Sequence, residues 1–224
     1  MLPLTFPYVD RAQTRILCLG AHADDIEIGC GGTILTLATT TAALQVTWVV
    51  FSSNEDRERE ARASADAILS DVPQKQILIE RFRDGFFPYT GGDIKDYFEH
   101  LKTQVAPDLI FTHYRHDLHQ DHRVISELTW NTFRKHLILE YEIPKYDGDL
   151  GSPNLFTRLD ESIVHKKTQI ILQFFQTQEH RHWFSADLFL ALMRMRGMES
   201  AAPSSYAEAF YARKLVLLSG CAAR

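Results

Sequence analysis

Two short clusters of histidine and acidic residues stand out in this 224-residue chain, roughly a hundred residues apart. The first runs from His22 to Glu27 and reads His-Ala-Asp-Asp-Ile-Glu; the second runs from Asp117 to His122 and reads Asp-Leu-His-Gln-Asp-His. Imidazole and carboxylate groups at this density can bind one divalent metal ion and leave a general base beside it. The combination favours hydrolysis.

Each cluster directly follows an apolar run, at residues 15–20 and 108–113, that predicts a buried strand. Ligands of an open parallel sheet bind at the carboxyl ends of its strands. If the two strands are neighbours, His22, Asp25 and His122 can converge on one ion. Two imidazoles and one carboxylate suit Zn²⁺ with water completing the shell, and the same donors could hold Fe²⁺.

The remaining cluster residues suggest roles beside the ion. Asp24 and Asp25 are adjacent, so one carboxylate can bind the metal while the other accepts a proton from the metal-bound water. His119 and His122 have i, i+3 spacing and face the same way at a helix start, so one can bind the metal while the other faces the substrate. Asp121 is expected to orient His119 through its second ring nitrogen.

Alternating strand and helix patterns extend over most of the chain. Strands are predicted at residues 15–20, 44–51, 76–82, 108–113, 136–143 and 214–218, and helices at 31–40, 54–70, 93–105, 121–134, 160–181 and 186–195. Gly29, Gly31 and Gly32 are expected to allow a tight turn between the first strand and its helix. The pattern predicts one α/β domain over 1–224, Rossmann-like, with a mostly parallel sheet and helices on both faces.

Composition excludes several classes of protein. Hydrophobic residues make up 45% and charged residues 24%, and the formal net charge of -5 argues against general nucleic-acid binding. No apolar stretch reaches the roughly 20 residues of a spanning helix, and the N-terminus lacks the basic region of a signal peptide. Cys18, Cys30 and Cys221 are too scattered for a disulfide framework. Cytoplasmic residence is the expectation.

The clusters resemble the motifs of a known family. Ala21–Thr33 is similar to the signature of the PIG-L/LmbE-like zinc N-deacetylases, with Ala23 where proline is usual, and Asp117–His122 resembles the second motif. Matches to other parts of the family follow in the expected order, at Arg57–Glu60, Pro153–Phe156, Arg196–Gly197 and Tyr206–Phe210.

The resemblance implies a Rossmann-like fold and removal of an acetyl group from an amino sugar. It implies metal binding by the residues already grouped, which are His22, Asp25 and His122. It implies that Asp24 is the general base, and that His119, with Asp121 behind it, stabilises the tetrahedral intermediate or protonates the leaving amine. Arg57, with Arg59 as an alternative, would contact the sugar. Some members carry a substrate-contacting tyrosine where this chain has Asp117.

Several alternatives stay open at this point. The expected partner is a small N-acetylated sugar or glycoconjugate, but an amidase for a non-sugar or thiol-conjugate amide fits the same residues. A non-catalytic metal- or sugar-binding module is a third interpretation, although binding alone does not need Asp24 and His119. The glycine spacing does not match the dinucleotide fingerprint, which disfavours a nucleotide-binding protein. The sequence leaves the exact substrate, the native metal and homo-oligomer formation open.

Overall fold

The structure is a computed structural model that describes residues 13–216. Within this range, seven strands form one sheet in the order β3-β2-β1-β4-β5-β7-β6. The first five in the chain are parallel: β1 (Thr14–Gly20), β2 (Leu44–Val50), β3 (Gln74–Ile79), β4 (Leu109–His113) and β5 (Leu137–Tyr141). Two antiparallel strands, β7 (Ala207–Ala212) and β6 (Leu155–Arg158), extend the edge beyond β5. The predicted mostly parallel α/β sheet is confirmed.

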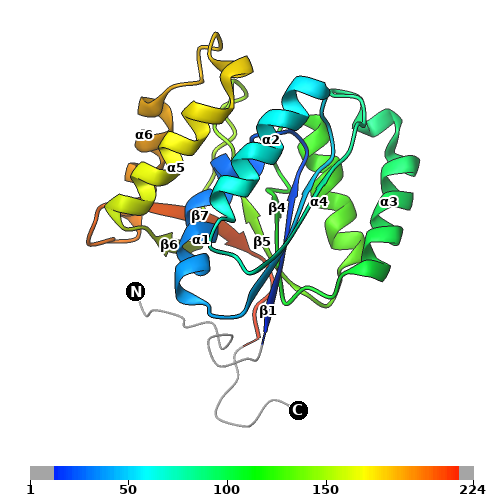
Figure 1. Cartoon of the computed structure of the whole chain (residues 1–224), viewed down its shortest axis with the longest axis horizontal. Helices are drawn as coiled ribbons and strands as arrows, with labels where there is room; N and C mark the ends of the chain where they lie inside the picture. The colour runs from blue at the N-terminus through cyan, green and yellow to red at the C-terminus, as the bar shows by residue number, and fades with distance from the viewer. Residues whose placement is uncertain (1–12, 217–224) are drawn as a thin grey trace.

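Helices cover both faces of this sheet (Figure 1). One layer contains α1 (Asp25–Thr40), α2 (Glu55–Ile68), α5 (Glu161–Phe174) and α6 (Ala186–Glu199); the other contains α3 (Gly91–Gln104) and α4 (Gln120–Thr132). Alternate side chains of β1 point to opposite faces of the sheet. Ile16 and Cys18 therefore pack in one buried cluster, and Leu17 and Leu19 pack in the other. The continuous apolar run of β1 therefore reflects burial on both faces.

The first helix begins earlier than predicted, at Asp25 rather than residue 31. Gly29, Gly31 and Gly32 consequently lie inside α1 and do not form a turn, so that expectation was wrong. Their use is close packing: a Cβ on Gly29 would lie 2.2 Å from the ring of Tyr141, and one on Gly32 would lie 2.7 Å from Leu159. The absence of a side chain lets β5 and the C-terminal part approach the helix.

The C-terminal half departs most from the predicted elements. The helix predicted over 160–181 ends at Phe174 and is followed by a short 3-10 turn at Gln176–Gln178. The last strand is β7, at Ala207–Ala212, whereas 213–216 have no regular structure and 217–218 lie outside the described residues. Cys221 and the N-terminal segment considered for a signal peptide also lie outside them.

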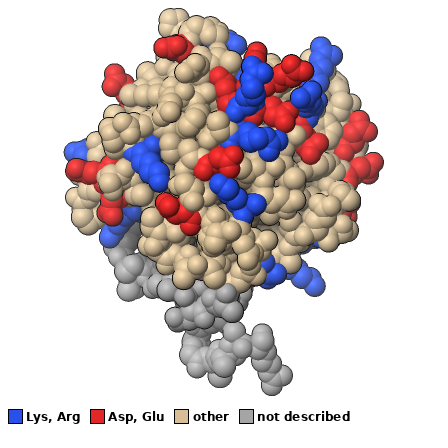
Figure 2. Space-filling view, viewed as in Figure 1, with Lys and Arg blue, Asp and Glu red and all other residues tan. Residues whose placement is uncertain are grey.

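The described residues contain no helix that combines the length and apolarity needed to cross a bilayer. Acidic and basic side chains are interspersed over the face shown in Figure 2. Many are paired locally on α2, where Arg59 contacts Asp56 and Arg62 lies 3.2 Å from Glu58. Mixed charge of this kind is the solvated helix face that the alternating arginines and glutamates predict.

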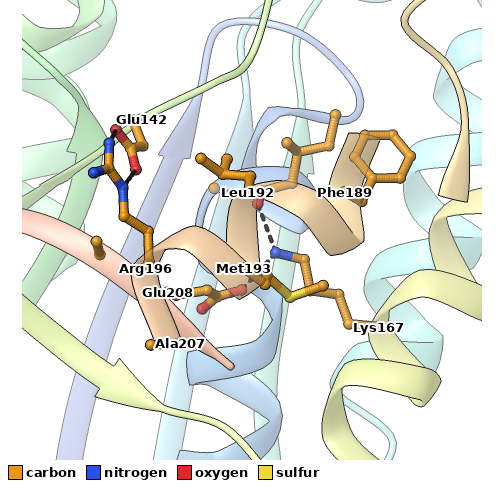
Figure 3. Close-up of a pocket in the computed structure, with 11 residues that line it drawn as sticks. Glu142, Lys167, Phe189, Leu192, Met193, Arg196, Ala207 and Glu208 are labelled. Carbon is orange, nitrogen blue, oxygen red and sulfur yellow. Dashed lines mark hydrogen bonds and ion pairs between the residues drawn. The ribbon is translucent and has the colours of Figure 1, made fainter. Parts of the chain in front are cut away.

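A buried ion pair attaches the C-terminal part to α1 (Figure 3). Lys167 of α5 donates to Glu208 of β7 at 2.6 Å and to the Ile28 carbonyl at 2.7 Å. Glu208 in turn accepts the backbone N–H groups of Gly32 and Thr33 at 2.8 and 2.7 Å. Because both charges are almost fully buried, each depends on the other and on these polar groups for its solvation.

We predict that Glu208→Gln lowers the free energy of unfolding by about 3–5 kcal/mol, since it leaves Lys167 buried without a countercharge. Urea unfolding followed by circular dichroism measures this loss. The control is Glu99→Gln, because Glu99 pairs with two half-exposed lysines at the surface, where loss of an ion pair changes stability little. Equal losses for the two variants would contradict this account of the pair.

Candidate metal centre

The two sequence clusters meet where β1 and β4 lie side by side. These strands pair in parallel, with Ile16 opposite Leu109 and Cys18 opposite Phe111. Both end at the same edge of the sheet, and α1 and α4 begin there at Asp25 and Gln120. The neighbouring strands β2 and β5 lie on opposite sides of this pair, so the site occupies the point where the strand order reverses.

The three predicted ligands converge. His22 Nδ1 lies 3.1 Å from His122 Nε2 and 3.4 Å from Asp25 Oδ2, and His122 Nε2 lies 3.4 Å from Asp25 Oδ1. A tetrahedral ion with ligand distances of about 2.0–2.1 Å has ligand–ligand edges of about 3.3 Å. The two imidazole nitrogens and the Asp25 carboxylate, which faces each of them with a different oxygen, thus lie at spacings close to this value. All three side chains are largely buried.

Electrostatics differs among the three donors. Burial, followed by the neighbouring His113, lowers the pKa of His122 to about 3, so its imidazole is neutral and able to bind a metal. Burial alone would raise the pKa of Asp25, but the surrounding histidines hold it well below its usual range. Burial alone would lower the pKa of His22, yet nearby carboxylates, chiefly Asp25 and Asp121, raise it well above its usual value.

Asp117 supports the candidate ligand His122, a role that sequence reasoning missed. Its Oδ2 lies 2.9 Å from His122 Nδ1 and accepts from Lys145 Nζ at 2.8 Å, while its Oδ1 accepts the His119 N–H at 2.8 Å. Burial opposes ionisation of Asp117, but His122 and Lys145 hold its pKa far below the usual range. A carboxylate behind a ligand histidine fixes the ring and raises its basicity.

His113 is a second residue whose role sequence reasoning missed. It ends the strand predicted over 108–113 and is the last residue of β4, with 0% exposure, but no role in the site was predicted for it. Its Nε2 accepts the Ala21 N–H at 2.9 Å and lies 3.2 Å from Asp25 Oδ2. Its ring stacks on His122 with centroids 3.9 Å apart. The only signal in the sequence is its position at the end of the predicted strand.

His119 lies beside the ligands as the N-cap of α4, with its ring 4.5 Å from that of His122 and 4.8 Å from that of His22. Its Nδ1 accepts the backbone N–H of Asp121 at 3.3 Å, so the neutral ring carries its proton on Nε2. Burial, with His22 nearby, lowers the pKa of His119 and favours this neutral form. His119 can therefore donate a hydrogen bond through Nε2.

The carboxylate of Asp121 does not orient His119, which corrects the expectation from the sequence. It lies 3.3 Å from His22 Nε2 and accepts the N–H groups of Gly85 and Phe87 at 2.6 and 3.1 Å. Asp121 therefore supports a ligand histidine and the loop after β3. The difference arises because His119 Nδ1 is occupied by the Asp121 backbone, which leaves the side chain free to turn toward His22.

Asp24 is a buried carboxylate next to the three ligands, at the N-cap of α1. Its Oδ2 lies 3.0 Å from Arg57 Nη2, and Arg57 Nη1 also donates to Glu60 at 3.0 Å. Burial raises the pKa of Asp24 despite the opposing effect of Arg57. Arg57, predicted to contact the sugar, thus fixes Asp24, whereas the alternative Arg59 is exposed and pairs with Asp56.

Asp84 completes the group of acidic residues at this edge, from the loop after β3. Its side chain is 75% exposed, and its Oδ1 lies 3.1 Å from His22 Nε2. The next residue, Gly85, has φ +75°, a conformation that other residues rarely adopt, and this turn aims its N–H at Asp121. The Asp84 carboxylate therefore lies at the solvent-exposed side of the site, which we call the open side.

The fold is similar to that of several solved structures. A conserved protein of Thermus thermophilus has a TM-score of 0.69 and 18% identity, with 91% of this chain and 96% of that chain covered. The N,N'-diacetylchitobiose deacetylase of Pyrococcus horikoshii has a TM-score of 0.62 and 21% identity, with 91% and 85% covered. The 4-carboxy-2-hydroxymuconate hydratase of Pseudomonas putida has a TM-score of 0.70 and 15% identity, with 94% and 100% covered.

At these identities the likeness shows the fold alone, which a deacetylase and a hydratase share. No curated protein matches the chain in sequence. The family model of PIG-L, described as GlcNAc-PI de-N-acetylase, matches residues 17–133, which is more than half of the chain and includes both clusters. With two motifs brought together as one candidate metal centre, this chain belongs to the PIG-L family.

Proposed function

We propose that this protein is a divalent-metal-dependent deacetylase that hydrolyses the N-acetyl group of an amino sugar or sugar conjugate and releases acetate. The observation that carries the proposal is the convergence of His22, Asp25 and His122. Asp24 and His119 flank these donors, as hydrolysis requires and binding alone does not. The family match and the deacetylase of similar fold support the same reaction.

Zn²⁺ is the proposed metal, and Fe²⁺ is the alternative that the same donors would accept. The donor spacing and the neutral state of His122 both fit such an ion. When bound, a divalent ion lowers the pKa of water and polarises the amide carbonyl. His22, Asp25 and His122 would hold it, with Asp117 and Asp121 fixing the two imidazole rings.

Asp24 is the proposed general base. Its burial raises the carboxylate's proton affinity, and Arg57 holds the side chain in one place. A base of this kind removes a proton from the attacking water as the C–O bond forms. Because Arg57 binds both Asp24 and Glu60, its first proposed role is to position the base. Its second proposed role is the predicted contact with the sugar, through the N–H groups that these two contacts do not use.

His119 is the proposed donor to the oxyanion. Its Nδ1 accepts the Asp121 N–H, so Nε2–H is available to stabilise negative charge that develops on the amide oxygen. Since the lowered pKa keeps this ring neutral, the proton for the leaving amine comes from Asp24, which took it from water. The hydroxyl group of water thus ends in acetate and one proton of water ends on the free amine, and Asp24 returns to its ionised state.

The hydratase of similar fold shows that the sheet does not define the reaction, so the substrate is proposed from the site. The exposed Asp84 carboxylate can accept hydrogen bonds from sugar hydroxyl groups at the open side. An amidase for a non-sugar amide would use the same central residues. A panel of N-acetyl sugars and simple acetamides, assayed for released acetate, separates the two.

Replacing the proposed base tests the catalytic assignment. We predict that Asp24→Ala binds metal with the stoichiometry of the parent protein but loses about 10²–10⁴-fold in kcat, as expected for loss of a general base. Asp56→Asn, a change to an exposed carboxylate in the first turn of α2, is the control and keeps full activity. Acetate release by Asp24→Ala at the parent rate would refute the assignment.

Replacing Asp117 tests its support of the metal ligand. Asp117→Asn keeps the side-chain size but weakens the contact with His122 Nδ1, so we predict a loss of zinc affinity of about 10–100-fold. Competition with a chromophoric chelator measures this affinity. An unchanged affinity, in a variant with the parent circular dichroism spectrum, would show that the contact does not matter for metal binding.

The raised pKa of His22 predicts that metal uptake releases a proton. In the metal-free protein His22 is protonated at neutral pH, and a metal must displace that proton. Metal affinity therefore rises about tenfold per pH unit until the pH passes the folded pKa. The same shift stabilises the metal-free fold below the unfolded pKa of about 6.5 and is lost as pH rises through the folded pKa.

Isothermal titration calorimetry with zinc in buffers of different ionisation enthalpy counts the released protons. We expect close to one proton more at pH 7 than at a pH above the folded pKa of His22. The same heat of binding in every buffer would contradict the protonated state of His22.

A further inference from the structure

The turn that follows α5 contacts the helix that carries the partner of the proposed base. Helices α2 and α5 lie next to each other in one layer (Figure 1). Arg57 lies in the first part of α2, and α5 is followed by the 3-10 turn Gln176–Gln178. This turn lies beyond residue 133, where the match to the family model ends. It reaches Arg57 through Phe175 and Thr177, which the proposed reaction has not used.

Thr177 binds both carboxylate oxygens of Glu60. Its backbone N–H donates to Oε1 at 2.8 Å, and its hydroxyl donates to Oε2 at 2.7 Å. Because a hydroxyl group has one proton, the same oxygen acts as an acceptor toward Arg57 Nη1, at 3.3 Å. The Glu60 side chain is only 12% exposed, so these bonds are largely shielded from water. The turn after α5 therefore fixes the orientation of Glu60.

Arg57 is held on three sides. Its Nη1 donates to Glu60 Oε2 at 3.0 Å, and its Nη2 lies 3.0 Å from Asp24 Oδ2. Its guanidinium carbon lies 5.2 Å from the centroid of the Phe175 ring, a distance typical of a cation–π contact. Each of the two terminal nitrogens thus has a carboxylate of its own, and the ring limits movement of the group between them.

Glu60 and Asp24 compete for this one guanidinium group. An arginine that binds both oxygens of a carboxylate forms a stronger pair than one that binds a single oxygen. Because Thr177 already binds both oxygens of Glu60, Glu60 takes Arg57 through Nη1 alone, and Nη2 stays with Asp24. Within residues 13–216, the Asp24 side chain makes no capping hydrogen bond to α1. The direction of its carboxylate therefore depends on Arg57.

We propose that Thr177 is a positioning residue for the proposed base. Its hydroxyl keeps Glu60 from drawing Arg57 away from Asp24, and Arg57 in turn holds the Asp24 carboxylate in the orientation that removes a proton from water. The inference rests on the proposed function. It adds a requirement for the C-terminal part of the chain, which carries none of the predicted metal ligands.

The first experiment removes the hydroxyl alone. Thr177→Val keeps the size and the backbone N–H, and Thr177→Ser keeps the hydroxyl. The probe is N-acetylglucosamine, replaced by the fastest substrate of the acetamide panel where that sugar gives no acetate. We expect Thr177→Val to lose about 10–100-fold in kcat, as a misplaced catalytic group does, with KM and zinc stoichiometry unchanged. Thr177→Ser should restore kcat to near the parent value.

The matched control is Thr168→Val on α5. Thr168 is also a buried threonine, and its hydroxyl donates to the Val164 carbonyl of the same helix at 2.8 Å. This variant loses a hydroxyl from the same helix without touching Arg57 or Glu60, so we expect it to keep the parent kcat.

Two further measurements separate positioning of the base from a general structural role. With Asp24→Ala there is no base to position, so adding Thr177→Val should leave the residual rate unchanged. A crystal structure of Thr177→Val should show Arg57 Nη2 moved from Asp24 to Glu60. This structural readout does not depend on turnover.

Three results would overturn the inference. The first is the parent kcat in Thr177→Val, and the second is an equal fold-loss in the presence and absence of Asp24. The third is a Thr177→Val structure in which Arg57 keeps its contact with Asp24. Absence of acetate from every probe with the parent protein would instead refute the proposed function, while the structure of the variant still decides whether Thr177 holds Arg57 in place.

Discussion

The parallel pairing of β1 with β4 is the constraint on which the rest of this structure depends. A tetrahedral divalent ion requires its donor atoms to lie about 3.3 Å apart. In this protein the candidate donors come from parts of the chain that are about 100 residues apart. The pairing meets this requirement because both strands end at one edge, where His22 and Asp25 follow β1 and His122 follows β4. Burial of β1 on both faces by two helical layers keeps that edge in place.

Each candidate ligand is supported by a further buried group. Asp117 fixes His122, Asp121 faces His22, and Asp25 Oδ2 accepts the backbone N–H of His22 at 2.6 Å. The supporting residues in turn hold the loops of the open side, through Lys145 and through the N–H of Gly85. The candidate metal ligands, the proposed catalytic groups and the loops beside them are thus joined by one network of hydrogen bonds and ion pairs.

The central part of the site could be predicted from the sequence, because each cluster lies within a few residues of the end of a strand and parallel strands share their carboxyl edge. The supporting contacts could not be predicted in this way. The role of Asp121 depends on which ring nitrogen of His119 its backbone meets, and the role of Asp117 depends on Lys145, which follows another strand. Side-chain direction in loops has no period that a sequence pattern could reveal.

The fold was likewise predictable where periodicity is strong. The first five strands and the positions of the helices follow from apolar patterns, whereas β7 was missed because its alanine-rich segment has weak strand propensity. The glycines of α1 were misread as turn residues because their partner, the Tyr141 ring, comes from a distant strand. Close packing of this kind depends on tertiary structure alone.

The most direct test of the account is the location of a bound ion. Crystals of the zinc-loaded protein, measured on both sides of the zinc absorption edge, would show its position by anomalous scattering. We expect one principal peak with His22 Nδ1, His122 Nε2 and an Asp25 oxygen about 2.0–2.2 Å away. A zinc peak elsewhere, with these three side chains making no contact to it, would contradict the central claim.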